Sequence, residues 1–152
     1  MKQVTLWIIT KDSKILLCMK KRWFWAWLWN WAWWKLEKWE SIEESMIREL
    51  EEETWLKSKL EDLECYWVLH FYFDKNPEWN QDVNLFKIND YIWDPIETEE
   101  MKPKWFKISK IPYNEMWEDD IIWLPRMLNW EKIEYDFYFW EDWKIRDYLL
   151  IK

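Results

Sequence analysis

Glycine is absent from this chain of 152 residues, and its absence constrains the turns of any fold more than any other feature. Ordinary usage of about 7% predicts roughly 11 glycines at this length. The chain has 19 tryptophans instead, nearly all of them where turn chemistry favours glycine. Asn129-Trp130 and Asp142-Trp143 flank a strand-like run where Asn-Gly and Asp-Gly are the usual hairpin turns. The simplest interpretation is a wholesale replacement of glycine by tryptophan. The exceptions, which look original, include Trp29, Trp105, Trp117 and Trp123.

The replacement predicts strained backbone and crowded loops. Glycine in loops often adopts φ > 0 or lies where backbone meets a ligand. A side chain at φ > 0 costs on the order of 1–2 kcal/mol, and overpacking adds typically about 1–3 kcal/mol. At roughly ten or more sites, this cost is comparable with a typical net stability of about 5–15 kcal/mol. We therefore expect the chain to fold poorly and to have little activity.

The length suits a single domain, residues 1–152, that can bury a core without disulfides. A net charge of −8 repels nucleic acid polymers, whereas a small anionic ligand can bind through a bridging metal cation. Cys18 and Cys65 match neither a disulfide framework nor a zinc spacing, which is typical of reduced thiols in the cytoplasm. No run is apolar enough for a signal peptide or a spanning helix. We expect a cytoplasmic monomer without membrane contact.

Periodicity predicts an α+β domain in which helices pack on a mixed sheet. Alternating and apolar runs predict strands at 3–10, 14–19, 63–74, 82–89 and 104–108, with a closing hairpin at 131–139 and 144–151. Asp119 and Asp120 are interpreted as caps of a helix that ends near residue 128. A second helix is predicted over 41–54, because Ser41 and Glu44 form a capping-box pattern ahead of an apolar stripe.

That helix carries the candidate chemistry. Glu49, Glu52 and Glu53 are three or four residues apart, so we expect all three to project toward one side, opposite the apolar stripe. Arg48 offsets part of their repulsion through an i,i+4 pair with Glu52. Converging carboxylates suit a hard cation such as Mg²⁺, although an acidic run by itself is more often a solvated face.

The wider spacing favours the metal-binding interpretation. The chain reads Trp34-x5-Glu40-x7-Arg48-Glu49-Leu50-x-Glu52-Glu53-x-Trp55-Leu56. This pattern resembles the Nudix box, Gly-x5-Glu-x7-Arg-Glu-(apolar)-x-Glu-Glu-x-Gly-(apolar), with tryptophan at both glycines. Residues 19–30, 99–106 and 111–120 are also similar to the oxidised-purine nucleoside triphosphate hydrolases of that family. The resemblance covers nearly the whole chain and implies an α/β/α sandwich with a mixed sheet.

The resemblance also implies an activity and a catalytic site. The reaction would be Mg²⁺- or Mn²⁺-dependent hydrolysis of oxidised purine triphosphates, such as 8-oxo-dGTP, to a monophosphate and pyrophosphate. Metal ligands would be Glu49, Glu52, Glu53, Glu100 and the carbonyl of Trp33. A metal-activated water would attack phosphorus. Arg48 would orient the glutamates, and Lys20 and Lys35 would lie near the phosphates. Which glutamate acts as the general base stays open.

The implied base pocket is lined by Thr5, Phe24, Asn30, Phe71, Phe73, Trp117, Asp119 and Asp120. Trp117 offers a stacking face, and one of two adjacent carboxyls in a dry pocket can stay protonated and donate to the base. Simpler alternatives remain, because the two aspartates can cap a helix and the two β-strand phenylalanines can be core. His70 is a lone strand histidine without candidate metal ligands near it in sequence, and it receives no role.

Two other classes of function remain open. Tryptophan-rich segments suit membrane interfaces and base stacking, so a non-catalytic binding protein is one alternative. The acidic charge and the intact box argue against it. The other is an engineered or corrupted chain without a function of its own, which the zero glycine count favours. Within the family, dinucleoside polyphosphates, nucleotide sugars and ADP-ribose are alternative substrates.

Overall fold

The computed structural model describes the chain except residues 22–27, 31–33, 36, 38, 100 and 152, and the side chains of Asn30, Trp34, Lys35 and Tyr66. Its strands are β1 (Lys2–Ile8), β2 (Thr10–Lys11), β3 (Lys14–Lys20), β4 (Trp29–Asn30), β5 (Trp34–Lys35), β6 (Leu63–Phe73), β7 (Gln81–Ile88), β8 (Met101–Lys107), β9 (Glu134–Phe139) and β10 (Ile145–Leu150). Its helices are α1 (Ile42–Thr54) and α2 (Asp120–Leu128), with short 3-10 turns at Leu60–Asp62, Pro77–Trp79, Ile108–Lys110 and Tyr113–Glu115. None of these described helices is long and apolar enough to span a membrane.

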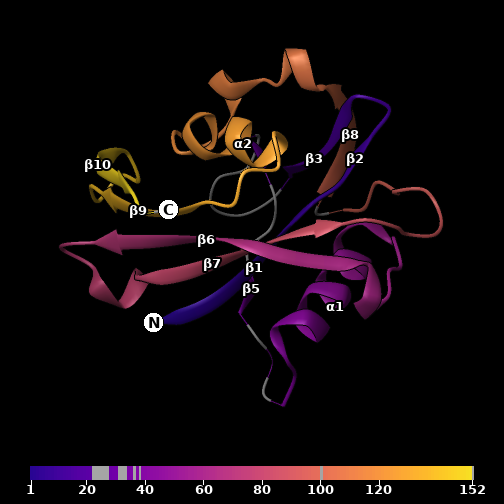
Figure 1. Cartoon of the computed structure of the whole chain (residues 1–152), viewed down its shortest axis with the longest axis horizontal. Helices are drawn as coiled ribbons and strands as arrows, with labels where there is room; N and C mark the ends of the chain where they lie inside the picture. Colours follow the sequence, from indigo (N-terminus) through magenta and orange to yellow (C-terminus); the bar gives the residue numbers. More distant parts are fainter. Residues whose placement is uncertain (22–27, 31–33, 36, 38, 100, 152) are drawn as a thin grey trace.

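A mixed sheet forms the middle layer. Its described strands run in the order β10-β9-β6-β7-β1-β5, with β1 parallel to β7 and β6 parallel to β9. A smaller sheet joins β2, β3 and β4, and β8 pairs with β3. The two helices lie on opposite sides of the larger sheet (Figure 1). The predicted α+β sandwich with a mixed sheet is confirmed.

Burial follows the position of each strand in these layers. β9 alternates, with Tyr135, Phe137 and Phe139 buried and the residues between them partly exposed. This period of two is expected of a strand with one covered face. In β1, by contrast, every residue from Val4 to Ile8 is buried. Both faces of β1 are therefore covered, and this is why the strand reads as an almost continuous apolar run.

Helix α1 begins and ends as the sequence predicts. The Ser41 hydroxyl accepts a hydrogen bond from the Glu44 N–H at 3.1 Å, and the Glu44 carboxylate accepts one from the Ser41 N–H at 3.3 Å. Met46 and Leu50 are fully buried under the sheet. The helix ends at Trp55, whose N–H donates to the Glu51 carbonyl at 2.8 Å. The capping box and the apolar stripe therefore fix the bounds of the helix.

Tryptophan does adopt the left-handed backbone that normally requires glycine. Among the described residues, five tryptophans have positive φ, namely Trp39 (79°), Trp55 (69°), Trp93 (72°), Trp130 (58°) and Trp143 (64°). Trp143 lies in the hairpin turn that the sequence predicts, between β9 and β10. Trp130 also has positive φ, but the predicted hairpin turn at Asn129-Trp130 is wrong, because these residues follow the C-terminus of α2. Four of these five residues are exposed, from 43% for Trp130 to 89% for Trp39, so their rings are not packed into the core. Trp143 is the exception, because its ring is half-buried.

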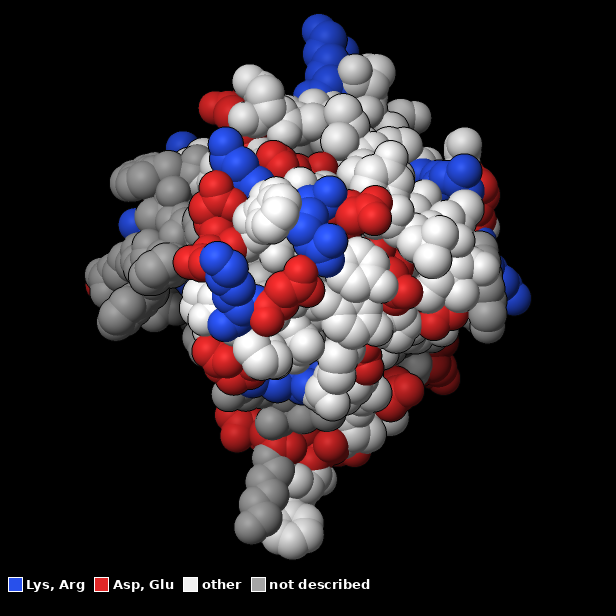
Figure 2. Space-filling view, turned by 90° about the vertical axis from the view of Figure 1, so that its left-hand side faces the viewer, with Lys and Arg blue, Asp and Glu red and all other residues white. Residues whose placement is uncertain are grey.

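Charges are interspersed on the described surface. Figure 2 shows the end of the molecule that carries β9 and β10, where acidic and basic side chains are interspersed among uncharged residues. Arg146 of β10 pairs with Asp74 at 2.9 Å and lies over the Tyr138 ring at 5.3 Å.

Cys18 is buried and Cys65 is exposed, and both are free thiols as predicted.

Candidate active site

The contact between α1 and β1 positions two buried carboxyl groups. Two strand residues rise about 6.6 Å and four helix residues about 6 Å, so i,i+2 positions on a strand match i,i+4 positions on a helix. Thr5 of β1 accordingly meets Glu49 of α1, and Trp7 meets Glu53. The Thr5 hydroxyl donates to Glu49 Oε2 at 2.8 Å, and the Trp7 indole N–H donates to Glu53 Oε2 at 3.1 Å.

Glu49 is the more deeply buried of the two carboxyls. Its side chain is fully buried, and the Ser45 hydroxyl donates to its other oxygen, Oε1, at 3.2 Å. Burial raises the pKa of Glu49 to about 8, although hydrogen bonds from Thr5 and Ser45 and the charge of Arg48 oppose the rise. A carboxyl group that exchanges its proton near neutral pH is suited to acid–base chemistry or to compensation by a cation.

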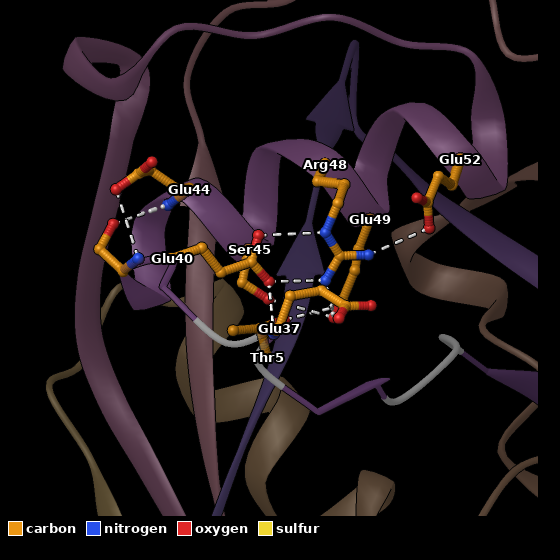
Figure 3. A network of polar contacts seen from close by, with 9 residues as sticks. Thr5, Glu37, Glu40, Glu44, Ser45, Arg48, Glu49 and Glu52 are labelled. Atoms are coloured by element: carbon orange, nitrogen blue, oxygen red, sulfur yellow. Dashed lines mark hydrogen bonds and ion pairs between the residues drawn. The ribbon is translucent and has the colours of Figure 1, made fainter.

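Arg48 connects α1 to the preceding loop. Its guanidinium makes a bidentate pair with Glu40, at 2.7 Å from Nη2 and 3.1 Å from Nε, and its Nη1 reaches Glu52 at 3.2 Å (Figure 3). The guanidinium lowers the pKa of Glu40. Glu40 in turn accepts from the Glu37 N–H at 2.7 Å. Glu40, to which the sequence analysis gave no role of its own, therefore anchors the loop to the helix through Arg48.

The three glutamates that the sequence places on one side of α1 differ in burial and in partners. Glu49 and Glu53 turn inward to donors on β1, whereas the Glu52 side chain is 59% exposed and pairs with Arg48. The tertiary contact with β1 decides this, because the sheet supplies donors only along one line of the helix. Within the described chain, no group of three or more His, Cys, Asp or Glu side chains is placed to hold a metal ion.

The remaining predicted site residues differ in how much of each the structure describes. Phe24, Trp33 and Glu100 are not described. Asn30 pairs with Cys18 between β4 and β3, and Lys35 pairs with Val4 between β5 and β1, but only their backbones are described. Lys20 ends β3 opposite Met101. Thr5, predicted in the base pocket, makes its described side-chain hydrogen bond with Glu49.

A second acidic pair is buried where α2 begins. Asp119 occupies the N-cap position but makes no side-chain capping bond, so its predicted capping role is wrong. Its carboxylate instead accepts from the Trp123 indole N–H at 2.8 Å. Burial raises the pKa of Asp119 to about 6, and burial together with the charge of Asp119 raises the pKa of Asp120 well above its usual value. Asp120 Oδ2 has no hydrogen-bond partner among the described residues.

The predicted aromatic residues meet beside this pair. Phe71 and Phe73 of β6 are buried and pack against Phe139 at 4.9 and 5.1 Å between ring centroids. Both side chains are buried in an aromatic cluster, as the simpler interpretation predicts, and Phe73 also lies at the side of the cluster that contacts Trp143. Trp143, which the sequence analysis treated only as a turn residue, lies 4.6 Å from Phe73 and 5.2 Å from Trp117. It joins the two predicted walls of the pocket.

His70 has partners that the sequence analysis did not foresee. Its Nδ1 lies 2.6 Å from Asp82 and its Nε2 lies 2.8 Å from Glu134, so it bridges β7 and β9. Burial lowers its pKa, but the hydrogen bonds and charges of Glu134 and Asp82 outweigh burial and raise it. These partners are 12 and 64 residues away in sequence, so only the strand pairing reveals them.

A mixed sheet with a carboxylate-bearing, capping-box helix packed against strand β1 defines an α+β class of protein. Comparison with known proteins identifies the family. The family model of the NUDIX domain matches residues 1–127. The chain is 39% identical over 127 residues to an oxidized purine nucleoside triphosphate hydrolase of Danio rerio, covering 84% of this chain and 80% of that protein. It is 36% identical over 128 residues to the Mus musculus protein of the same name, with the same coverage. The chain belongs to the Nudix family.

A solved structure agrees on the fold. The crystal structure of a mutator MutT protein from Bacillus halodurans matches with a TM-score of 0.83, covering 99% of this chain and 98% of that one at 23% identity. The likeness extends beyond the family match, which ends at residue 127, because it includes the closing strands β9 and β10.

Proposed function

We propose that this chain is a Nudix hydrolase that cleaves oxidised purine nucleoside triphosphates, such as 8-oxo-dGTP, to a monophosphate and pyrophosphate. The two similar proteins from Danio rerio and Mus musculus carry oxidized purine nucleoside triphosphate hydrolase as their name. The intact charged positions of the box in α1 support the hydrolytic part of the proposal. The proposed enzyme is a cytoplasmic monomer that acts on a small molecule.

The buried pair Asp119 and Asp120 is the observation that carries the base specificity. An oxidised purine presents donors and acceptors on the same edge, and a half-protonated pair of carboxyls offers the complementary set. The raised pKa of both groups supports one shared proton near neutral pH. The free oxygen of Asp120 supports a partner that arrives with the ligand, since a buried polar atom left unpaired costs free energy.

The donor set of α1 fits a divalent cation in its chemistry. Mg²⁺ and Mn²⁺ prefer carboxyl oxygens, and burial of Glu49 without a full counter-charge is a cost that a cation relieves. Glu49 and Glu53 would hold the cation, and Glu52, Glu100 and the Trp33 carbonyl are the further ligands that the family resemblance implies. When bound, the cation neutralises phosphate charge and activates water.

The residues of the chain itself have three tasks in this reaction. Thr5, Ser45 and Trp7 hold the inner carboxyls in place through their hydrogen bonds. Arg48 keeps Glu52 and the Glu40 loop against the helix. A buried glutamate, Glu49 or Glu53, takes the proton of the attacking water, and the Glu49→Gln and Glu53→Gln variants assign this role. We expect turnover to be low, because five described tryptophans adopt left-handed backbone.

The test is substrate comparison with product analysis. The purified chain is incubated with Mg²⁺ and 8-oxo-dGTP, dGTP or ADP-ribose, and monophosphate and pyrophosphate are quantified. Preferential release of both products from 8-oxo-dGTP supports the proposal. Preference for ADP-ribose, or hydrolysis that a Glu53→Gln variant retains in full, contradicts it. A variant with glycine at Trp39 and Trp55 tests whether turnover rises as the strain is removed.

A further inference from the structure

Trp143 lies in the turn that joins β9 to β10. The Trp140 N–H donates to the Lys144 carbonyl at 2.8 Å, and the Trp143 N–H donates to the Trp140 carbonyl at 3.0 Å. With φ at 64°, Trp143 occupies the left-handed position of a short hairpin loop, which glycine normally takes. The turn therefore holds a large ring at a position where most hairpins carry no side chain.

The ring of Trp143 packs inward, whereas the other described tryptophans with positive φ are exposed. Its centroid lies 4.6 Å from Phe73 and 5.2 Å from Trp117, and 6.1 Å from both Phe139 and Trp79. These separations are those of aromatic rings in direct contact. No further ring fits between Trp143 and either Phe73 or Trp117.

The hairpin is tied to the acidic pair as well. The N–H of Ile145, two residues after Trp143, donates a hydrogen bond to Glu118 Oε1 at 3.1 Å. Glu118 directly precedes Asp119 and follows Trp117. The start of β10 is thus joined to the segment that carries one wall of the proposed base pocket and both of its aspartates.

We propose that Trp143 is an internal plug of the purine site, an indole that occupies the aromatic space between Phe73 and Trp117 and must leave before a base can stack there. This inference rests on the proposed function, because that function assigns the space to an oxidised purine. It goes beyond that function by naming the residue of this chain that limits entry of the base. The indole is itself a flat bicyclic ring of purine-like shape, so it competes for the same faces.

The test measures binding of the base without catalysis. Isothermal titration calorimetry with 8-oxo-dGMP, in the absence of metal, compares the parental chain with Trp143→Gly and Trp143→Ala. We expect both variants to bind at least tenfold more tightly. Trp143→Ala keeps a side chain at the left-handed position and removes only the ring, so it separates removal of the plug from relief of backbone strain.

Trp93→Gly is the matched control. Trp93 also has positive φ, at 72°, but its ring is 60% exposed and lies over Lys57. The Trp93→Gly substitution relieves the same kind of backbone strain without opening the aromatic cluster. We expect the affinity of this variant for 8-oxo-dGMP to equal that of the parental chain. Near-UV circular dichroism of all four proteins verifies that each is folded.

The outcomes separate the plug from the proposed function. Equal affinity for 8-oxo-dGMP in the parental chain and in both Trp143 variants would overturn the proposal that Trp143 is a plug. Weaker binding by the variants would also overturn it and would make Trp143 a wall of the site. Either result leaves the proposed function standing if the parental chain hydrolyses 8-oxo-dGTP. Tighter binding by the variants without any hydrolysis of 8-oxo-dGTP supports the plug and contradicts the proposed function. Absence of both binding and hydrolysis in every variant overturns both.

Discussion

The two buried acidic pairs of this protein are built in opposite ways. Glu49 and Glu53 are one helical turn apart, and each accepts a hydrogen bond from its own donor on β1. Asp119 and Asp120 are adjacent, and their described side-chain donor is the Trp123 indole, which bonds Asp119. Separate donors hold each glutamate in one orientation, whereas adjacency without enough donors couples the protonation of the aspartates. The first arrangement suits fixed catalytic groups, and the second suits recognition of a ligand that brings its own donors and acceptors.

The largest expected effect is a loss of 8-oxo-dGTP turnover when a carboxyl of the glutamate pair is replaced. Glu49→Gln removes an ionisable group from the catalytic pair while keeping its shape, and we expect 8-oxo-dGTP turnover to fall by about 10²–10⁴-fold. Steady-state kinetics with pyrophosphate detection measures the loss. Affinity for 8-oxo-dGMP should be unchanged, because Glu49 lies with Thr5 and Ser45 rather than with the aspartates. A loss confined to affinity would remove the distinction between the two pairs.

The next effect concerns the aspartates. Asp120→Asn fixes a donor and an acceptor in place of an exchangeable proton, and we expect the preference for 8-oxo-dGTP over dGTP to fall by roughly 10–100-fold, as for a lost buried hydrogen bond. The ratio of kcat/KM for the two substrates measures it. The pKa of both carboxyls is raised, so the parental preference should decline as the shared proton is lost at rising pH. The variant should show a flatter pH profile, and an unchanged profile would contradict the shared proton.

A smaller effect concerns the end of the helix that carries the catalytic pair. Trp55 closes α1 with φ at 69° and its ring is 55% exposed, so Trp55→Gly should stabilise the fold by about 1–2 kcal/mol. Thermal unfolding followed by near-UV circular dichroism measures the gain. Trp140→Gly serves as the control, because Trp140 is similarly exposed and is absent from the described residues with positive φ. Equal gains in both variants would show that removal of an exposed ring, not backbone strain, matters.

The smallest effect uses a third pair of carboxyls, Asp82 and Glu134, which has its own counter-charge in His70. The folded pKa of His70 is raised, so its contribution is fully present below the unfolded value near 6.5 and is lost as pH rises through the folded pKa. We expect His70→Gln to lower stability by on the order of 1 kcal/mol at pH 5.5 and by less at pH 9. Urea unfolding at both pH values measures it, and a loss that is constant with pH would contradict the bridge.

Local features of the fold followed from the sequence. Ser41 and Glu44 satisfy the first N–H groups of α1 by themselves, so their spacing alone marks where the helix begins. The longer strands followed from alternating or apolar runs, to within a few residues at each end. The left-handed backbone of Trp130 and Trp143 followed from their positions after Asn129 and Asp142. Each of these features depends on residues that are close to one another in the sequence.

The orientation of the site residues did not follow from the sequence. Helical spacing allowed Glu52 to point with Glu49 and Glu53, but only the latter two meet donors on β1. The position of Asp119 suggested a cap, yet the Trp123 indole attracts its carboxylate. His70 finds carboxylates on two other strands, and Trp143 enters an aromatic cluster built from β6, β9 and the Trp117 segment.

The sequence by itself determined the family, the order of elements, the helix caps and which residue types are available for chemistry. The tertiary structure alone decided which of those side chains are buried, which share a proton and which ring fills the proposed base site. The physical reason is that caps and turns are satisfied by groups within a few residues. Burial and hydrogen bonding between distant segments, by contrast, depend on sheet order and on how α1 packs on β1, and no local pattern encodes these.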